Sequence, residues 1–231
     1  LSFLPRPVGG AAPLWHRKWV VRRTRVSFAL RQADAVLRPG DPRLALGVAT
    51  AYGMLAIAGG ALAYYFAGGR PFEHPAPWVV LPPLAASALS VAIGVAFAFA
   101  IVVTTRLTVA RYDWARRLHL ELQPVARRFG TRETLLIAVL SSLGEELFFR
   151  AFLTPVIGIV GSSLLFGFLH QVKGQSRWVW AAWATGVGLF FAALFAMTGS
   201  LLGPIVAHAL INATNLTFLK KHEVSSSPLP S

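Results

Sequence analysis

Long apolar runs separated by short polar segments dominate the pattern of hydrophobic and polar positions along this chain. A helix needs about 20 apolar residues to cross the hydrocarbon core of a bilayer. Six stretches approach or exceed this length, and the fourth of them is short: residues 45–67, 78–105, 134–156, 157–172, 178–197 and 201–219. The pattern therefore predicts an all-α fold, a polytopic bundle of about six transmembrane helices.

The polar segments predict two surface elements beside these spans. Residues 1–44 contain nine Lys and Arg side chains but no apolar run of the kind that a cleavable signal peptide requires. We expect them to form a basic arm on the anionic headgroups of the bilayer, with Trp15 and Trp19 at the interface. Residues 111–132 are rich in arginine and too polar to span. This composition favours a cytoplasmic interfacial helix.

These segments divide the chain into five parts. The basic arm is followed by two accessory transmembrane helices in residues 45–110 and then by the interfacial helix. A helical core in residues 133–219 carries the candidate chemistry, and residues 220–231 form a polar tail. Because Lys and Arg collect on the cytoplasmic side of membrane proteins, we expect both termini to be cytoplasmic.

Composition and charge agree with a membrane protein. The 231 residues are 55% hydrophobic and only 13% charged, with a mean hydropathy of +0.58, whereas soluble domains have about 25% charged residues. The chain has no cysteine, which excludes disulfides and Cys-ligated metal sites. A net charge of +13 would suggest nucleic acid in a soluble protein, but here membrane topology explains it better, and no nucleic-acid partner is expected.

Two adjacent glutamates and an arginine, Glu145, Glu146 and Arg150, lie inside the third predicted span. An ionisable group at this depth is costly unless it is paired or faces water, so each one is a candidate functional group. Glu146 and Arg150 are four residues apart, share a helix face and are expected to form an ion pair. Glu145 is rotated by about 100° from Glu146 and is left without that partner. An unpaired carboxylate in a low-dielectric site is suited to act as a general base or acid.

Later spans carry three further polar candidates, His170, His208 and Asn212. A lone histidine in a span is as often a core residue as a functional group. His208 and Asn212, however, are four residues apart and present two hydrogen-bond donors on one helix face, as an oxyanion site requires. Phe166 precedes His170 by four residues and either orients its imidazole or packs in the core. A water between Glu145 and His170, facing the other two side chains, would allow amide hydrolysis.

Two alternatives use other chemistry. Two carboxylates and two histidines are a plausible zinc set, but the chain has no HExxH motif. We therefore expect no metal cofactor, with zinc as the alternative. Serine nucleophiles are also conceivable, but no GxSxG motif surrounds the serines of the spans, which are Ser141, Ser142, Ser162 and Ser163.

The motifs EELFFR, FGFLH and HALIN occur in this order, each within an apolar stretch. With them the chain resembles the CPBP family of intramembrane proteases, also called the ABI or CAAX-protease-and-bacteriocin-processing family, which includes the type II CAAX prenyl endopeptidase. The family pattern is Glu-Glu-x-x-x-Arg, then Phe-x-x-x-His, then His-x-x-x-Asn or Asp. All three motifs match within about residues 131–219.

The resemblance implies an endopeptidase of the cytoplasmic membrane of a bacterium, acting on a membrane-embedded or lipidated protein. In it Glu145 and His170 would activate water, His208 and Asn212 would form the oxyanion site, and Glu146 and Arg150 would be structural or orient the substrate. The family is often labelled a metalloprotease, which keeps the zinc alternative open. Two other functions would use the same residues differently, a proton-coupled transporter and a catalytically idle scaffold or immunity protein.

Overall fold

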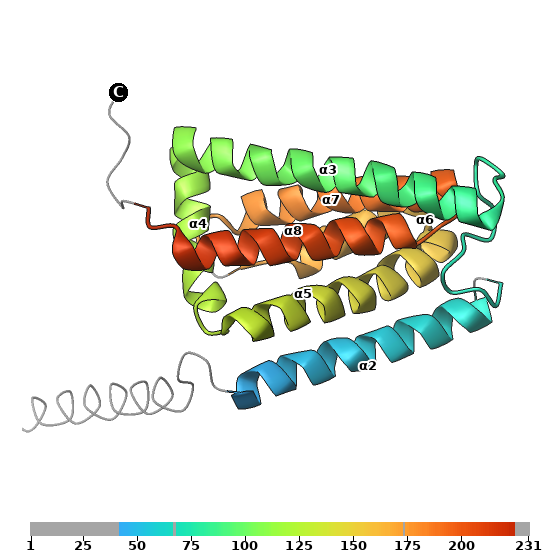
Figure 1. Ribbon diagram of the computed structural model, residues 1–231, viewed down its shortest axis with the longest axis horizontal. Helices are drawn as coiled ribbons and strands as arrows, with labels where there is room; N and C mark the ends of the chain where they lie inside the picture. The colour runs from blue at the N-terminus through green and yellow to red at the C-terminus, as the bar shows by residue number, and fades with distance from the viewer. Residues whose placement is uncertain (1–41, 67, 173, 225–231) are drawn as a thin grey trace, which may run out of the picture. The chain divides into compact units, whose positions relative to one another are not determined.

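The computed structural model describes residues 42–224, except for residues 67 and 173. Within these residues, extended backbone pairs only in one isolated bridge, between Glu73 and Ser200, and all other regular structure is helical. The helices are α2 (Pro42–Phe66), α3 (Pro83–Arg111), α4 (Asp113–Ala126), α5 (Thr131–Glu145), the π-helical η1 (Glu146–Leu153), α6 (Thr154–Leu169), α7 (Arg177–Thr198) and α8 (Leu202–Lys221) (Figure 1). Residues 1–41 of the predicted basic arm and residues 225–231 of the predicted tail lie outside the described residues.

Local sequence accounts for several helix ends. Helix α3 begins at Pro83, where the missing amide donor would have no partner in the first turn anyway. Helix α7 is followed by Gly199 in the left-handed conformation, with φ of 78°, which is a common way to end a helix. Lys220 and Lys221 lie in the last turn of α8, where the helix dipole favours cations.

Five helical stretches of the described chain are long and apolar enough to cross a membrane, not six as the pattern predicts. They are Pro42–Phe66, Pro83–Arg111, Thr131–Leu169, Arg177–Thr198 and Leu202–Lys221. The third stretch contains both predicted spans 134–156 and 157–172, which are separated by a kink at Gly158, close to the predicted boundary. The all-α, polytopic fold is confirmed, but the third stretch is built differently from the expectation.

A sharp kink at Gly158 turns the third stretch back on itself. Its φ of 78° and ψ of 168° lie in a region that residues with side chains avoid. Across the kink, the hydroxyl oxygens of Thr154 and Ser162 are 2.9 Å apart. An unbroken helix would separate Glu145 and His170 by about 37 Å, yet Nε2 of His170 lies 3.4 Å from Oε2 of Glu145. The chain between them therefore has to reverse direction.

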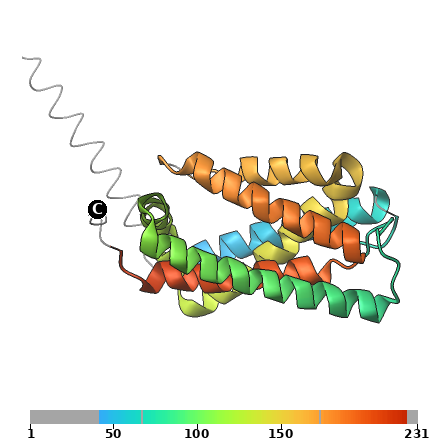
Figure 2. The same ribbon diagram turned by 90° about the horizontal axis from the view of Figure 1, so that it is seen from above.

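The returning arm of this hairpin is short. Only residues 159–169 remain helical after the kink, a rise of about 16 Å, which is roughly half of the hydrocarbon core. His170 therefore ends the arm at the level of Glu145 rather than at a membrane surface. Figure 2 shows the hairpin beside α7. Just before α7, the amides of Gln175 and Ser176 donate hydrogen bonds to the Glu121 carboxylate of α4, at 3.1 and 3.2 Å.

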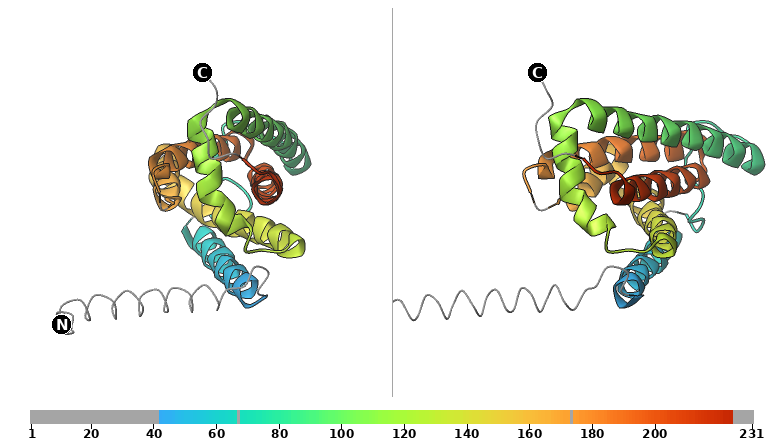
Figure 3. Two further views of the ribbon diagram at one scale, coloured as in Figure 1. Left: turned by 90° about the vertical axis from the view of Figure 1, so that its left-hand side faces the viewer. Right: turned by 60° about the vertical axis from the view of Figure 1, so that its left-hand side comes forward.

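The connections gather at two ends of the bundle (Figure 3). At one end, the loop between α2 and α3 meets the connection between α7 and α8, where the amide of His74 donates to the carbonyl of Gly199 at 2.9 Å. At the other end, α4 lies across the ends of the long helices, and its His119 and Gln123 side chains contact the carbonyl oxygen of His222. Helix α4, with the arginines within and beside it, and the basic end of α8 thus share one end.

Helix α2 packs directly on α5 and η1 at glycines. A Cβ atom added to Gly59 would lie 2.7 Å from the backbone nitrogen of Phe148, and one added to Gly144 would lie 2.7 Å from the carbonyl oxygen of Tyr52. Both distances are shorter than real Cβ contacts, so the missing side chains allow the close approach of these helices. Helix α2 therefore lies against the segment that carries Glu145.

Candidate active site

The π-helix η1 carries a buried ion pair. Nε of Arg150 lies 3.2 Å from Oε2 of Glu146, and the two side chains are 1% and 0% exposed. The expected pairing is therefore present, although the segment is π-helical rather than α-helical as the spacing argument assumed. Short π-helical turns of this kind often occur at functional sites.

Aromatic rings enclose the guanidinium of Arg150. Its central carbon lies 4.2, 5.4 and 5.8 Å from the ring centroids of Phe166, Phe191 and Phe149. Its Nη1 and Nη2 atoms have no hydrogen-bond acceptor among the described residues, so cation–π contacts take the place of hydrogen bonds there. Phe166 also packs against the imidazole of His170, with 4.1 Å between ring centroids and an angle of 38° between the ring planes. This ring therefore holds two of the candidate side chains.

His208 of α8 connects the two glutamates. Its Nδ1 lies 2.7 Å from Oε1 of Glu146. An ionised carboxylate can only accept hydrogen bonds, so Nδ1 carries the proton and donates. The other ring nitrogen, Nε2, lies 3.8 Å from Oε2 of Glu145. The carboxylate of Glu146 thus fixes both the orientation and the tautomer of this imidazole.

His170 approaches Glu145 from the end of α6. Its Nδ1 lies 2.8 Å from the carbonyl oxygen of Phe166, which can only accept, so Nδ1 donates here too. With neutral rings, the Nε2 atoms of His170 and His208 are both acceptors, and both face Oε2 of Glu145. Three acceptors around one point require a shared proton, or a donor such as water between them. This group of three is suited to binding and moving a proton.

Asn212 lies one turn beyond His208 on α8. Its Nδ2 donates to Oγ of Ser141 on α5 at 3.1 Å, while Ser141 donates to the carbonyl oxygen of Ala138. Asn212 is partly buried. The sequence suggests Ser141 only as a nucleophile without a supporting motif. In the structure, Ser141 instead holds the amide of Asn212 against the helix that carries Glu145.

The zinc alternative requires a converging set of ligands. Among the described residues, no group of three or more His, Asp and Glu side chains is arranged so that it could hold a metal ion. Nδ1 of each histidine already donates a hydrogen bond, to Phe166 or to Glu146, so only the Nε2 atoms, which both lie near Glu145, are open as ligands.

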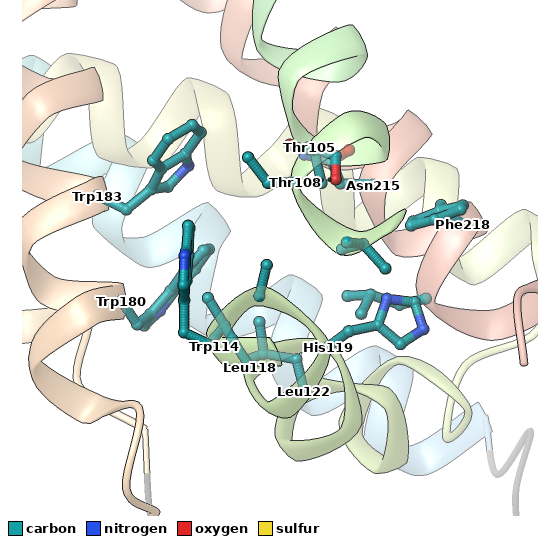
Figure 4. Close-up of a pocket in the computed structure, with 13 residues that line it drawn as sticks. Thr105, Thr108, Trp114, Leu118, His119, Leu122, Trp180, Trp183, Asn215 and Phe218 are labelled. Carbon is teal, nitrogen blue, oxygen red and sulfur yellow. Dashed lines mark hydrogen bonds between the residues drawn. The ribbon is translucent and has the colours of Figure 1, made fainter. Parts of the chain in front are cut away.

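A separate apolar pocket of about 90 Å³ lies where α3, α4, α7 and α8 meet. Figure 4 shows the rings of Trp114, Trp180 and Trp183 around its apolar side and Asn215 at its polar edge. Glu145 is not among the residues that line it, and neither are the candidate histidines. The polar group around Glu145 and this pocket are therefore distinct features of the bundle.

Tyr52 of α2 is a neighbour of Glu145 that the motifs do not include. Its hydroxyl group lies close enough to the Glu145 carboxylate to interact with it. In the sequence, Tyr52 stands in an apolar run of a predicted accessory helix, and no spacing rule connects it to a glutamate more than 90 positions later. Only the packing of α2 against Gly144 reveals the contact.

Comparison with known proteins gives a family for part of the chain. Residues 129–214 match the model of the family described as type II CAAX prenyl endopeptidase Rce1-like. The expected resemblance is confirmed over these residues. This Rce1-like segment, residues 129–214, contains all the candidate residues of the three motifs, but it includes neither α2 nor α3.

One curated relative also matches. The chain is 31% identical over 77 residues to "Uncharacterized protein YpbD" of Bacillus subtilis (strain 168), an alignment that covers 33% of this chain and 40% of that protein. The chain therefore spans less than half of the length of this relative. No solved structure matches the chain at a significant level.

Proposed function

We propose that the protein is an intramembrane endopeptidase that hydrolyses a peptide bond of a membrane-embedded or lipidated protein. The observation that carries this proposal is the meeting of Glu145, His170 and His208 around one carboxylate oxygen, at distances of 3.4 and 3.8 Å. These groups come from three different elements. Their acceptor atoms face one another and need a shared proton or a water between them, which a purely structural polar contact would not require. The match of the Rce1-like segment supports the same reaction class.

Glu145 is the general base of this mechanism. A water between Glu145 and His170 donates a proton to the pair while its oxygen attacks the carbonyl carbon of the scissile bond. The C–N bond then breaks, and the same proton passes to the leaving amine. The products are an amine and a carboxylic acid, which releases its remaining proton to water, and no covalent enzyme intermediate forms.

His208 and Asn212 stabilise the oxyanion in this proposal. His208 donates to the oxyanion from Nε2 when this atom, like Nδ1, carries a proton. The amide of Asn212, held by Ser141, supplies a second donor. Glu146 and Arg150 act on the reaction indirectly, because their ion pair fixes the position of His208.

The short returning arm of the hairpin gives substrate a route to these residues. Because α6 ends at the level of Glu145, His170 stands at the end of a helix and its side chain is 26% exposed. The basic α4 end is cytoplasmic in this proposal, following the distribution of Lys and Arg. The scissile bond then enters from the cytoplasmic half of a bacterial membrane.

The test is a cleavage assay with the detergent-purified protein and fluorogenic membrane peptides that differ in their C-terminal sequence and lipid. We expect Glu145→Gln and His170→Ala to lower kcat by at least about 100-fold, because each removes the acid–base group. The matched control is Glu133→Gln, a carboxylate in the first turn of the same helix α5, which should cleave like wild type.

Unchanged cleavage by the Glu145 and His170 variants would refute the mechanism. A second arm adds a zinc chelator to the wild-type protein. Cleavage that continues in the chelator agrees with an acid–base mechanism carried by this chain, whereas loss of cleavage that zinc restores would return the zinc alternative.

A further inference from the structure

Helix α2 lies outside the Rce1-like segment, yet it reaches the candidate base. The glycine contacts described above place the carbonyl oxygen of Tyr52 directly above Gly144, the residue before Glu145. At this crossing the Tyr52 side chain is partly buried, and its hydroxyl group lies close enough to the Glu145 carboxylate to interact with it. An accessory helix therefore contributes a polar group to the centre of the site.

We propose that Tyr52 is a positioning residue for the catalytic base, holding the ionised carboxylate of Glu145 in place by donating a hydrogen bond to it. This role rests on the proposed function, because it assigns a task to Tyr52 only if Glu145 is the base.

The chemistry of the neighbouring groups explains why a phenol suits this position. His170 and His208 direct their Nε2 atoms at Glu145, and these atoms change between acceptor and donor as the histidines lose and gain protons. A tyrosine hydroxyl titrates near pH 10 and stays a donor throughout the neutral range. Tyr52 therefore offers Glu145 a hydrogen bond that does not depend on the protonation of either histidine.

The location of Tyr52 is also specific. Oε2 of Glu145 lacks a hydrogen-bond partner within normal limits among the described residues, although it faces both histidines. Helix α2 packs mainly on α5 and η1, so a donor from Tyr52 comes from a different element than either histidine.

Two substitutions on the same helix separate this role from a general need for tyrosine. Tyr52→Phe removes one oxygen and keeps the ring, so the packing against Gly144 should survive. Tyr65→Phe makes the same chemical change at a position on α2 that is 80% exposed. Thermal unfolding of both variants serves to establish that the fold is retained.

The first measurement is the pH dependence of cleavage. We expect Tyr52→Phe to lower kcat by about tenfold or more while KM changes little, since a hydrogen bond to a charged group is lost. The acid limb of the pH–rate profile should move by about one pH unit to higher pH, because the ionised carboxylate loses a stabilising donor. Tyr65→Phe should reproduce the wild-type profile. A Tyr52→Phe profile equal to wild type would overturn the inference.

The second measurement does not depend on activity. A hydrophobic carbodiimide reacts with protonated carboxyl groups in membranes, and mass spectrometry of the peptide that contains Glu145 reports the modified fraction at each pH. In Tyr52→Phe the midpoint of labelling should move to higher pH, and in Tyr65→Phe it should not. If the wild type cleaves nothing, the proposed function fails, while labelling still decides whether Tyr52 controls the protonation of Glu145. Identical labelling in all three proteins would overturn the role of Tyr52 alone.

Discussion

Two regions of the molecule use histidine in opposite ways. In the polar centre, defined by Glu145, Glu146, Arg150, His170 and His208, ionisable side chains contact one another deep in the bundle. In the α4–α8 contact, defined by His119, Gln123, Phe218 and His222, the side chains contact a backbone carbonyl at the end of the bundle. His119 and Gln123 are buried, as are the two glutamates and Arg150, but the hydrogen bonds of the two regions have different roles.

The α4–α8 contact is satisfied as it stands. Nε2 of His119 and Nε2 of Gln123 each donate to the carbonyl oxygen of His222 at 3.0 Å, which provides donors for the backbone just after α8. The His119 ring stands edge-on to Phe218, with 5.1 Å between centroids. These are the features of a docking contact that holds the surface helix in place.

The polar centre is different, because it keeps charges where apolar side chains would cost less. Replacing a buried ion pair by well-packed hydrophobic residues is often neutral or stabilising. The centre also leaves the Nη1 and Nη2 atoms of Arg150 and Oε2 of Glu145 without hydrogen-bond partners in the described part of the chain. A cluster that is worse for stability than its apolar equivalent calls for a functional reason, and general acid–base chemistry provides one.

The largest stability effect should come from breaking the ion pair on one side. Arg150→Met leaves the carboxylate of Glu146 buried with only His208 as partner, and we expect a loss of about 3–5 kcal/mol in the free energy of unfolding. Thermal or SDS-induced unfolding in micelles measures it. The double variant Glu146→Gln/Arg150→Met removes both charges and should recover much of this loss. If the double variant is as unstable as the single one, packing rather than charge governs this part of the bundle.

A smaller effect should come from separating α2 from the polar centre. A Cβ atom at Gly59 would lie 2.7 Å from the backbone nitrogen of Phe148, so Gly59→Ala should push α2 away and destabilise the protein by about 1–3 kcal/mol. The neighbouring Gly60 has open space at the same atom, and Gly60→Ala should stabilise the helix by up to about 1 kcal/mol. Cleavage should fall only in Gly59→Ala. Equal unfolding midpoints for the two variants would contradict the close packing of α2.

Much of this arrangement could be predicted from the sequence, because it rests on local patterns. Apolar runs of sufficient length located four of the five spanning stretches to within a few residues. The motif spacing also identified Glu146 and Arg150 as a pair, and it singled out Glu145, which the structure places beside His170. Each of these conclusions needs only the rise and turn of one helix, or the order of motifs along the chain.

The remaining features depend on tertiary structure, and no local pattern signals them. In the sequence, nothing distinguishes Gly158 from the other glycines of the apolar segments. In the structure, its backbone conformation joins two predicted spans in a hairpin, whose returning arm ends at Leu169. Tyr52 acquires a polar partner only because α2 crosses α5 at Gly144. The bond between His208 and Glu146 was also missed, since hydropathy places both residues in spans without saying which helices are neighbours.

The smallest effect should appear in the α4–α8 contact, as a dependence of stability on pH. Burial, together with the nearby cations Arg106 and Arg127, holds the pKa of His119 below its ordinary value of 6.5. The unfolded chain therefore binds this proton more readily than the folded one, so the stabilising contribution is complete above pH 6.5 and is lost as the pH falls through the lowered pKa. We expect the thermal midpoint of wild type to fall between pH 7.5 and about pH 5. In His119→Phe the fall should be smaller, whereas Gln123→Leu, which keeps the histidine, should retain it. A pH dependence that is the same in all three proteins would mean that the α4–α8 contact does not titrate, and that the acid-sensitive groups of this protein lie elsewhere, with the polar centre as the first place to look.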